Sequence, residues 1–351
     1  MVSDQPILID GSWGEGGGQI LRTSLALAGA MGRPVRITGI RAGRPKPGLR
    51  PQHLAAVRAA VTVCDGHVTG HTPGSQELTF TPGEPQSGQF SFDIGTAGST
   101  VLVAQTVLPI LLAAEGRSQV SITGGTHNPL APCFEYLRDV FGVLASAANL
   151  QAYFELKQAG FYPDGGGRLH VQVQGLGSPE MAAAVHLVSR GELTHIDGIS
   201  AASACLPRHV IERQTQQTLA LLGAAGQQAT LEETVFADAG PGSVVFLRAV
   251  FTKTVAGFFA LGAPGRPAET VAAEAVEQLL AFLDSSGATD ACAADQLLTL
   301  AALAPGQSRI ATQKVTDHLL TNAEVVRRLT GRAVSVEGEP GEGGMVTVEA
   351  I

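Results

Sequence analysis

The sequence of 351 residues has few cysteines, few charged side chains and no long apolar run. Its four cysteines lie far apart and form no C-x-x-C pair, so they indicate buried thiols rather than a zinc site or a disulfide framework. The absence of any run of about 18 apolar residues disfavours a membrane protein. Residues 1–21 lack the basic and then apolar order of a secretion signal, and we therefore expect a cytoplasmic protein.

Two common nucleotide-binding motifs are also absent. No glycine-rich segment ends in the Gly-Lys-Ser/Thr of a P-loop. A dinucleotide fingerprint that began at Gly14 would need a third glycine at position 19, where Gln19 stands, and no acidic residue follows about 20 residues later. Walker-type and Rossmann-type binding are both disfavoured.

The composition predicts a globular protein with a large core and an acidic surface. Hydrophobic residues make up 44% of the chain and charged residues 15%, and the length suits two domains or one elaborated domain. The net charge of −8 argues against a protein that coats long stretches of nucleic acid. The segment Arg22 to Arg58 departs from this balance, because it holds eight Lys or Arg residues and no Asp or Glu.

Four of these cations lie in the loop Arg41 to Arg50, where proline and glycine stiffen the backbone. Such a loop suits the binding of an anion, for which the alternative is an ordinary solvated basic surface. A second anion site is predicted at Asp10 to Thr23, where five glycines precede a helix that begins near Gln19. A carboxylate there, Glu15, makes sense if it holds a divalent cation that accompanies phosphates. The alternative is a flexible turn between a strand and a helix.

The order of elements predicts a repeated α/β fold. An apolar helix, a turn and a β-branched strand recur at Ile20 to Gly39, Val101 to Gly124 and Gln296 to Thr312. Each is followed by a second helix and strand, and these helices are predicted at Pro51 to Val63, Cys133 to Ala148 and Asn322 to Thr330. Between about Gly191 and Ser285 this order of helices and strands changes, which indicates an inserted α/β domain. We therefore predict modules of two helices on a four-stranded sheet within residues 1–186, a small domain at 187–284, and a final module at 285–351.

Among the nine histidines, His318 is the strongest candidate for chemistry. It lies just ahead of a predicted helix for which Asn322 would be the N-cap, and a neutral imidazole beside a helix N-terminus suits a nucleophile near phosphate. Asp317 is placed to orient the ring, although a purely structural role fits the same residues. His67 and His71 share a strand face but have no third metal ligand nearby.

Ten motifs in order along nearly the whole chain closely resemble those of the RNA 3′-terminal phosphate cyclases. This resemblance implies a large domain of repeated α/β modules, like the C-terminal domain of a translation initiation factor, with one smaller inserted α/β domain. The motifs are GEGGGQ (Gly14 to Gln19), Arg22, IRAGRPKPGL (Ile40 to Leu49), Gln52-His53, Gln105, Gly124-Gly125-Thr126, FYPDGGG (Phe161 to Gly167), Pro207-Arg208-His209, Ala294-Asp295-Gln296 and HLLTN (His318 to Asn322).

The resemblance implies ATP-dependent conversion of an RNA 3′-phosphate to a 2′,3′-cyclic phosphate, with His318 as the nucleophile that carries AMP. It places a divalent cation, Mg²⁺ or Mn²⁺, on Glu15. It also implies two binding groups. Triphosphate or the RNA end would be bound by Arg22, Arg41, Arg44 and Gln52. The nucleotide pocket would be lined by Gln105, Pro132, Cys292, Ala293, Ala294, Asp295 and Gln296.

One position departs from the family pattern, since members often carry an aromatic residue where Cys292 stands. Two rival functions remain open at this point. The first is a non-catalytic cyclase-like RNA-binding factor in ribosomal RNA processing, against which retention of His318 and Glu15 speaks. The second is a small-molecule transferase such as an enolpyruvyl transferase, which needs no histidine nucleophile. The physiological RNA, activity on DNA or 5′-phosphate ends, the preferred metal and the oligomeric state are not predicted.

Overall fold

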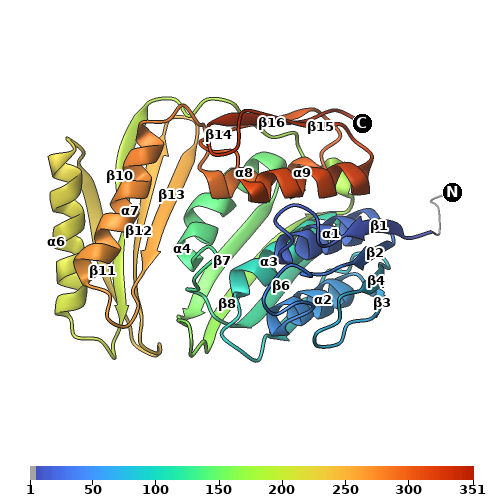
Figure 1. Cartoon of the computed structure of the whole chain (residues 1–351), viewed down its shortest axis with the longest axis horizontal. Helices are drawn as coiled ribbons and strands as arrows, with labels where there is room; N and C mark the ends of the chain where they lie inside the picture. The colour runs from blue at the N-terminus through green and yellow to red at the C-terminus, as the bar shows by residue number, and fades with distance from the viewer. Residues whose placement is uncertain (1–4) are drawn as a thin grey trace.

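A computed structural model describes residues 5–351, whose strands form four sheets of four strands each (Figure 1). The first sheet has the order β1-β2-β4-β3, and only its β1–β2 pair is parallel. Its two helices both follow a strand and return the chain to the same sheet. The elements are β1 (Ile7–Asp10), α1 (Gly18–Met31), β2 (Val35–Thr38), α2 (Pro51–Val63), β3 (His67–Thr69) and β4 (Leu78–Thr81).

The second sheet repeats this topology with the order β5-β6-β8-β7. Its second helical segment is interrupted by a π-helical turn (Leu137–Phe141) and ends in a 3₁₀ turn (Ser146–Ala148). The other elements are β5 (Gln89–Asp93), α3 (Thr100–Ala113), β6 (Glu115–Gly124), α4 (Phe134–Tyr136), α5 (Gly142–Ala145), β7 (Gln151–Gln158) and β8 (Gly167–Leu176), followed by a short 3₁₀ turn (Pro179–Met181).

The third sheet has the order β9-β14-β16-β15, which is the same topology once more. Its first strand is separated from the rest by more than a hundred residues, because the inserted segment lies between β9 and α8. The elements are β9 (His186–Leu187), α8 (Ala291–Ala301), β14 (Ser308–Thr312), α9 (Asp317–Thr330), β15 (Val334–Glu337) and β16 (Gly344–Val348).

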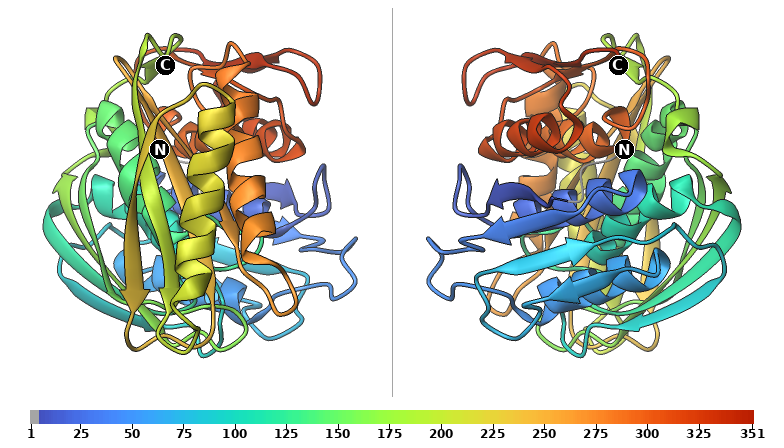
Figure 2. Two further views of the ribbon diagram at one scale, coloured as in Figure 1. Left: turned by 90° about the vertical axis from the view of Figure 1, so that its left-hand side faces the viewer. Right: turned by 90° about the vertical axis from the view of Figure 1, so that its right-hand side faces the viewer.

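The inserted segment forms its own sheet, in the order β11-β10-β12-β13, and its own apolar core. Its helices cover one face of that sheet, while Gly257 on the other face lies against Tyr136 and Val140 of the second module (Figures 1 and 2). The elements are β10 (Leu193–Ser203), α6 (His209–Ala224), β11 (Ala229–Phe236), β12 (Ser243–Phe251), β13 (Val255–Leu261) and α7 (Ala268–Leu283).

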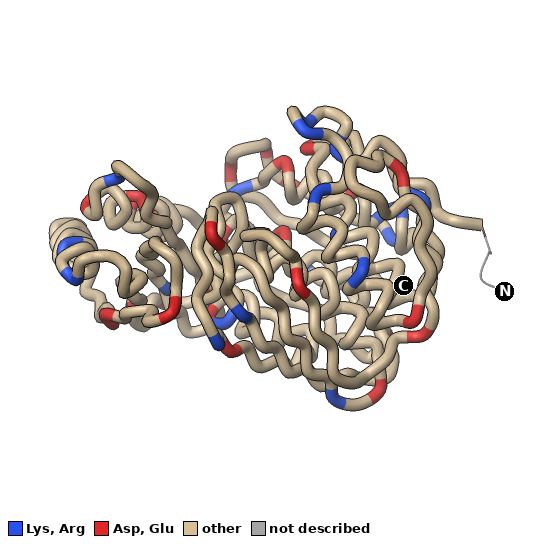
Figure 3. The backbone as a smooth tube through the Cα atoms, turned by 90° about the horizontal axis from the view of Figure 1, so that it is seen from below, with Lys and Arg blue, Asp and Glu red and all other residues tan. Residues whose placement is uncertain are grey.

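These sheets confirm the predicted repeated α/β fold with an additional α/β unit. The division of the chain at residues 186 and 284 into separately folding domains stays a prediction. Lys and Arg alternate with Asp and Glu over both the modules and the inserted unit (Figure 3). Within residues 5–351, no helix combines the length and the apolar character that crossing a membrane requires.

The modules meet through their helices. Helix α1 packs against both α3 and α9, although α9 lies about 300 residues further along the chain (Figure 1). Helix α8 packs against α9 and also contacts α1 and α3. Four helices from three modules therefore surround one region, and the predicted site residues gather there.

Candidate active site

The glycine-rich loop between β1 and α1 packs directly against α9. Gly14 and Gly16 have φ angles of 57° and 60°, a backbone conformation that favours glycine. A Cβ atom on Gly14 would collide with the hydroxyl of Thr321, which also accepts a hydrogen bond from the Glu15 amide at 3.1 Å. Thr321 lies one helical turn after His318, so this contact holds Glu15 beside that histidine.

Glu15 uses only part of its bonding capacity within the protein. One carboxylate oxygen forms an ion pair with Arg44, whose Nη2 also donates to the Glu15 carbonyl oxygen at 3.1 Å. The other oxygen, Oε2, is buried without a hydrogen-bond partner in the described chain and lies 3.9 Å from His318 Nδ1. An unpartnered, partly desolvated carboxylate oxygen is a ready ligand for a hard cation.

His318 lies in the first turn of α9. The prediction that this helix begins after His318, with Asn322 as its N-cap, was therefore wrong. The N-cap is Thr316, whose Oγ1 accepts a hydrogen bond from the Leu319 amide at 3.0 Å, so the helix begins five residues before Asn322. Asn322 lies inside the helix and is fully buried, and its amide group is satisfied by hydrogen bonds with Thr23 and Asp295. The half-exposed imidazole of His318 therefore sits at the positive end of α9.

Asp295 links the helices α1, α8 and α9. Its Oδ1 accepts from Asn322 Nδ2 at 3.1 Å and from Gln19 Nε2 at 3.4 Å, and Gln19 in turn accepts from Arg22 Nη2 at 2.9 Å. Burial raises the pKa of Asp295 to about 6, because the nearby charges of His318 and Arg22 offset only part of the desolvation. Burial likewise lowers the pKa of Arg22 to about 10.

A cavity of about 420 Å³ opens between these helices, a size within the range of small-molecule sites. Its lining is mainly apolar, with convergent polar groups from α1, α3, α8 and α9. Seven of the thirteen residues implicated by the resemblance line it, namely Arg22, Gln105, Pro132, Cys292, Asp295, Gln296 and His318.

Three residues on one side of the cavity are already hydrogen-bonded to one another. Gln105 Nε2 donates to Gln296 Oε1, and Gln296 Nε2 lies 2.7 Å from the sulfur of Cys292. Burial raises the pKa of the Cys292 thiol well above its usual value, which disfavours the reactive thiolate form. The segment is held by Asp290, the N-cap of α8, which accepts from the amides of Cys292 and Ala293 at 3.0 and 2.9 Å.

Asp290 also connects α8 to the rest of the molecule. It accepts a hydrogen bond from Tyr136 Oη at 2.6 Å and from the Gly257 amide of the inserted unit at 3.3 Å. This carboxylate is 3% exposed, and burial raises its pKa. Four donors from three parts of the fold therefore fix the start of the helix that carries Asp295 and Gln296.

The other six predicted residues do not line the cavity. Ala293 and Ala294 are fully buried in the core. Arg41 has a φ angle of 53° and donates to the carbonyl oxygens of Lys46 and Gly48, which closes the basic loop. Gln52 accepts from the Ser99 amide at the N-terminus of α3. Glu15 lies beside His318, and Arg44 is paired with Glu15.

Several cavity residues were missed by the sequence analysis. Phe141 comes from the π-helical turn, and Phe259 comes from β13, a strand that the sequence pattern did not predict. π-Helical turns in helices are frequent at functional sites, but a turn of this kind has no sequence signature that we could have used. Gln19 and Thr23 lie one turn apart on α1, and their periodicity was the available signal.

No group of three or more His, Cys, Asp or Glu side chains within residues 5–351 is arranged to hold a metal ion. A cation at this site would therefore take one carboxylate from the protein and further oxygens from a phosphate-bearing substrate, a pattern typical of Mg²⁺. The buried, unpartnered Oε2 of Glu15 fits that task.

A histidine at a helix N-terminus, arginines and a carboxylate around one cavity define an enzyme that acts on phosphate groups. Comparison with known proteins narrows this class. A family model described as RNA 3′-terminal phosphate cyclase matches residues 13–336, and the chain belongs to this family. It is accordingly a ligase-type enzyme of the RNA 3′-terminal phosphate cyclase kind.

Curated relatives cover nearly the whole chain. The RNA 3′-terminal phosphate cyclase of Methylococcus capsulatus is 44% identical over 328 residues, which is 91% of this chain and 90% of the relative. That of Hyperthermus butylicus is 43% identical over 330 residues, 92% of this chain and 91% of the relative. Among solved structures, the enolpyruvyl transferase NikO from Streptomyces tendae aligns over 99% of this chain and 82% of its own at 11% identity with a TM-score of 0.29, too weak a likeness to support an argument.

Proposed function

We propose that the protein converts an RNA 3′-terminal phosphate to a 2′,3′-cyclic phosphodiester, using ATP and a covalent histidyl-AMP on His318. The observation that carries this proposal is the place of His318, which borders the cavity at the N-terminus of α9 with Glu15 on the Nδ1 side of its ring. A nucleophile beside a nucleotide-sized cavity and a helix dipole is arranged for attack on phosphorus.

In the first step, the lone pair of His318 Nε2 attacks the α-phosphorus of ATP. The bond from that phosphorus to the bridging oxygen breaks, pyrophosphate leaves, and a phosphorus–nitrogen bond to AMP remains. Glu15 Oε2 lies 3.9 Å from Nδ1 and stabilises the positive charge that develops on the ring. The guanidinium of Arg22, at the edge of the cavity, compensates charge on the phosphates.

In the second step, an oxygen of the RNA 3′-phosphate attacks the same phosphorus and breaks its bond to His318. The adjacent 2′-hydroxyl oxygen then attacks the RNA phosphorus, loses its proton and expels AMP. Adenylylation makes this last step feasible, because AMP is a far better leaving group than an oxide of the bare phosphate. Arg41, Arg44 and Gln52 are the residues we assign to the RNA end, and Arg44 is paired with Glu15.

A divalent cation held by Glu15 would neutralise charge on the ATP phosphates. The adenine base would lie between Pro132 and the apolar side of the cavity, near Gln105 and Gln296. Cys292 offers no ring for stacking, and the aromatic surface is supplied instead by Phe141 and Phe259. Because only the RNA terminus enters, a protein with net charge −8 can act on RNA.

The test is transfer of label from α-labelled ATP to the protein in the presence of Mg²⁺ or Mn²⁺. Wild type and the control His71→Ala, an exposed histidine outside the family motifs, should form an adduct, and His318→Ala should form none. A phosphoramidate is labile in acid and stable in base, which identifies the bond. Folded wild-type protein without an adduct would contradict the covalent route and favour a non-catalytic RNA-binding role.

A further inference from the structure

His53 is a buried histidine next to the active site, and the reaction described above leaves it without a role. It lies in the first turn of α2 and is 8% exposed. Its Nδ1 accepts a hydrogen bond from the Arg50 amide at 3.1 Å. An amide N–H can only donate, so Nδ1 carries no proton and Nε2 carries the ring proton of the neutral imidazole.

The protonated Nε2 makes no hydrogen bond to any residue in the described part of the chain. It is directed at Gly18, the first residue of α1, because a Cβ atom on Gly18 would lie 2.5 Å from it. The same Cβ atom would lie 2.8 Å from Arg22 Nη1. His53 Nε2 and Arg22 Nη1 therefore flank the N-terminus of a 14-residue helix, where backbone N–H groups already favour an anion.

Resting on the proposed function, we propose that His53 binds a substrate phosphate through a neutral Nε2–H donor at the N-terminus of α1. The bound atom is a phosphate oxygen, whether of ATP or of the RNA end. Glycine at position 18 leaves the space for this contact, and the hydrogen bond from Arg50 fixes the ring tautomer.

The surroundings of His53 keep the imidazole neutral. Burial first, and then the charges of Arg22, Arg41 and Arg50, lower the pKa of His53 to about 3. Protonation of Nδ1 would also replace an accepted hydrogen bond with two opposed N–H groups. The site thus gains a directed donor without a further positive charge, in a place where a fourth cation would repel the other three.

Two substitutions separate the two ring nitrogens. In His53→Asn the amide oxygen replaces Nδ1 and can still accept from Arg50, but no donor reaches the position of Nε2. In His53→Gln the amide nitrogen reaches the position of Nε2, and the hydrogen bond to Arg50 is lost. If the donor matters, Asn should slow the affected step about tenfold to a hundredfold, the range for a hydrogen bond to a charged group, whereas Gln should stay within a few fold of wild type.

Single-turnover assays show which phosphate is bound. Slower labelling from α-labelled ATP in His53→Asn assigns the contact to ATP, whereas normal labelling with slower AMP transfer to a 3′-phosphorylated RNA assigns it to the RNA end. Normal rates in both steps overturn the inference, as does a Gln variant impaired as much as the Asn variant. If wild type forms no adduct, the proposed function fails instead, and calorimetric binding of inorganic triphosphate to the three proteins still decides the role of His53.

Discussion

The pKa of a buried carboxylate is raised in one charged region of the molecule and lowered in another. In the active site, burial raises the pKa of Asp295 to about 6, and the charges of His318 and Arg22 offset this only partly. Where the inserted unit meets the second module, burial acts on Glu135 too, but the charge and hydrogen bond of His127 outweigh it and the pKa of Glu135 is lowered. One carboxylate is left poorly compensated, and the other is fully paired.

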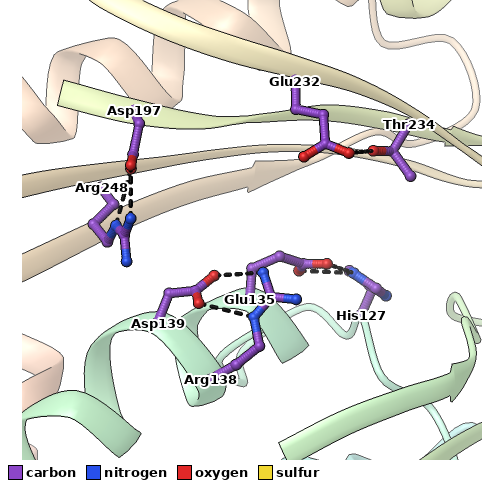
Figure 4. Close-up of polar contacts among 8 residues, drawn as sticks. All are labelled: His127, Glu135, Arg138, Asp139, Asp197, Glu232, Thr234 and Arg248. Atoms are coloured by element: carbon purple, nitrogen blue, oxygen red, sulfur yellow. Dashed lines mark hydrogen bonds and ion pairs between the residues drawn. The ribbon is translucent and has the colours of Figure 1, made fainter.

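Most of the charged side chains drawn at the interface are paired with an opposite charge (Figure 4). His127 Nε2 lies 3.0 Å from Glu135 Oε2, and its other nitrogen lies 2.9 Å from Thr126 Oγ1. The ring also packs against Phe161 and against Phe236 of the inserted unit. Two further ion pairs face each other from the second module and the inserted sheet, and they are Arg138 with Asp139 and Arg248 with Asp197.

The candidate active site differs because a buried carboxylate oxygen there, Oε2 of Glu15, has no hydrogen-bond partner within residues 5–351. A protein that leaves such groups unpaired loses stability, and a ligand that completes them binds more tightly for the same reason. The comparison separates charges that hold the fold together from charges that the proposed function assigns to substrate binding.

The largest expected effect is on stability, for Glu135→Ala at the interface. Removal of one partner of a buried pair leaves the other uncompensated, so we expect a loss of about 3–5 kcal/mol in the free energy of unfolding. Urea denaturation at pH 7 measures it. Because the pKa of Glu135 is lowered, its stabilisation is present above the ordinary pKa and is lost as the pH falls through the folded value, so the difference should shrink in acid.

Glu232→Ala is the matched control for this prediction, since Glu232 lies at the same interface but is exposed and bonded only to Thr234. It should change stability by less than about 0.5 kcal/mol. A loss below about 1 kcal/mol in Glu135→Ala would remove the basis for calling this interface charge-paired.

The next effect is on rate, for Glu15→Gln in the site. The substitution keeps the shape and removes the anionic oxygen, so we expect adduct formation to slow by about a hundredfold, or nearly 3 kcal/mol of activation free energy. Stability should fall only slightly, because Oε2 has no hydrogen-bond partner among the described residues and the ion pair of the other oxygen is with the partly exposed Arg44. Label transfer at saturating Mn²⁺ measures the rate, with Glu77→Gln at the exposed pair with Arg36 as control. A large drop in stability at normal rate would reverse the assignment.

The third prediction concerns pH and Asp295. Its raised pKa means that between about pH 4 and 6 the folded state holds a proton that the unfolded state has lost, so stability should fall as the pH rises through this window and then level off. Asp295→Asn removes this penalty of up to about 3 kcal/mol. Urea unfolding at pH 4.5 and pH 7.5 should show the variant gaining on wild type at the higher pH. An equal difference at both values would contradict a raised pKa.

The smallest effect is expected for the pair of Arg248 with Asp197. The two side chains join through distances of 2.6 and 2.9 Å but remain about a quarter to a third exposed. A double-mutant cycle with Arg248→Gln and Asp197→Asn should give a coupling free energy of at most about 1 kcal/mol. A coupling free energy several times larger would show that this pair stabilises the fold as strongly as the buried pair of His127 and Glu135.

Much of the fold was predictable where local signals were strong. Helix α2 begins at Pro51 and ends at Val63, as predicted, because proline suits the first helical position and the segment is amphipathic. The segment Cys133 to Ala148 was predicted as one helix, yet it contains a π-helical turn that a regular apolar period does not reveal. Strand β13 and helix α7 were not predicted at all.

The site was harder to predict because its groups are joined through long-range contacts. Thr316 and Asn322 are both good N-cap residues, and only the partners of Asn322, Thr23 and Asp295, decide between them. Phe259 reaches the cavity from another sheet, over a hundred residues from Phe141. The sequence itself singled out His318, and the resemblance to a family added Arg22 and five other lining residues that periodicity alone did not single out.

Asp290 couples the inserted unit to α8, the helix that carries several of the residues proposed to bind the nucleotide. Its carboxylate bonds the Gly257 amide on one side and starts α8, with Asp295 and Gln296, on the other. Coupling of this kind is reciprocal by thermodynamic necessity. If a nucleotide binds against α8, as the proposed function requires, it should also hold the inserted unit in place, and amide hydrogen exchange along β13 should slow when the cavity is occupied.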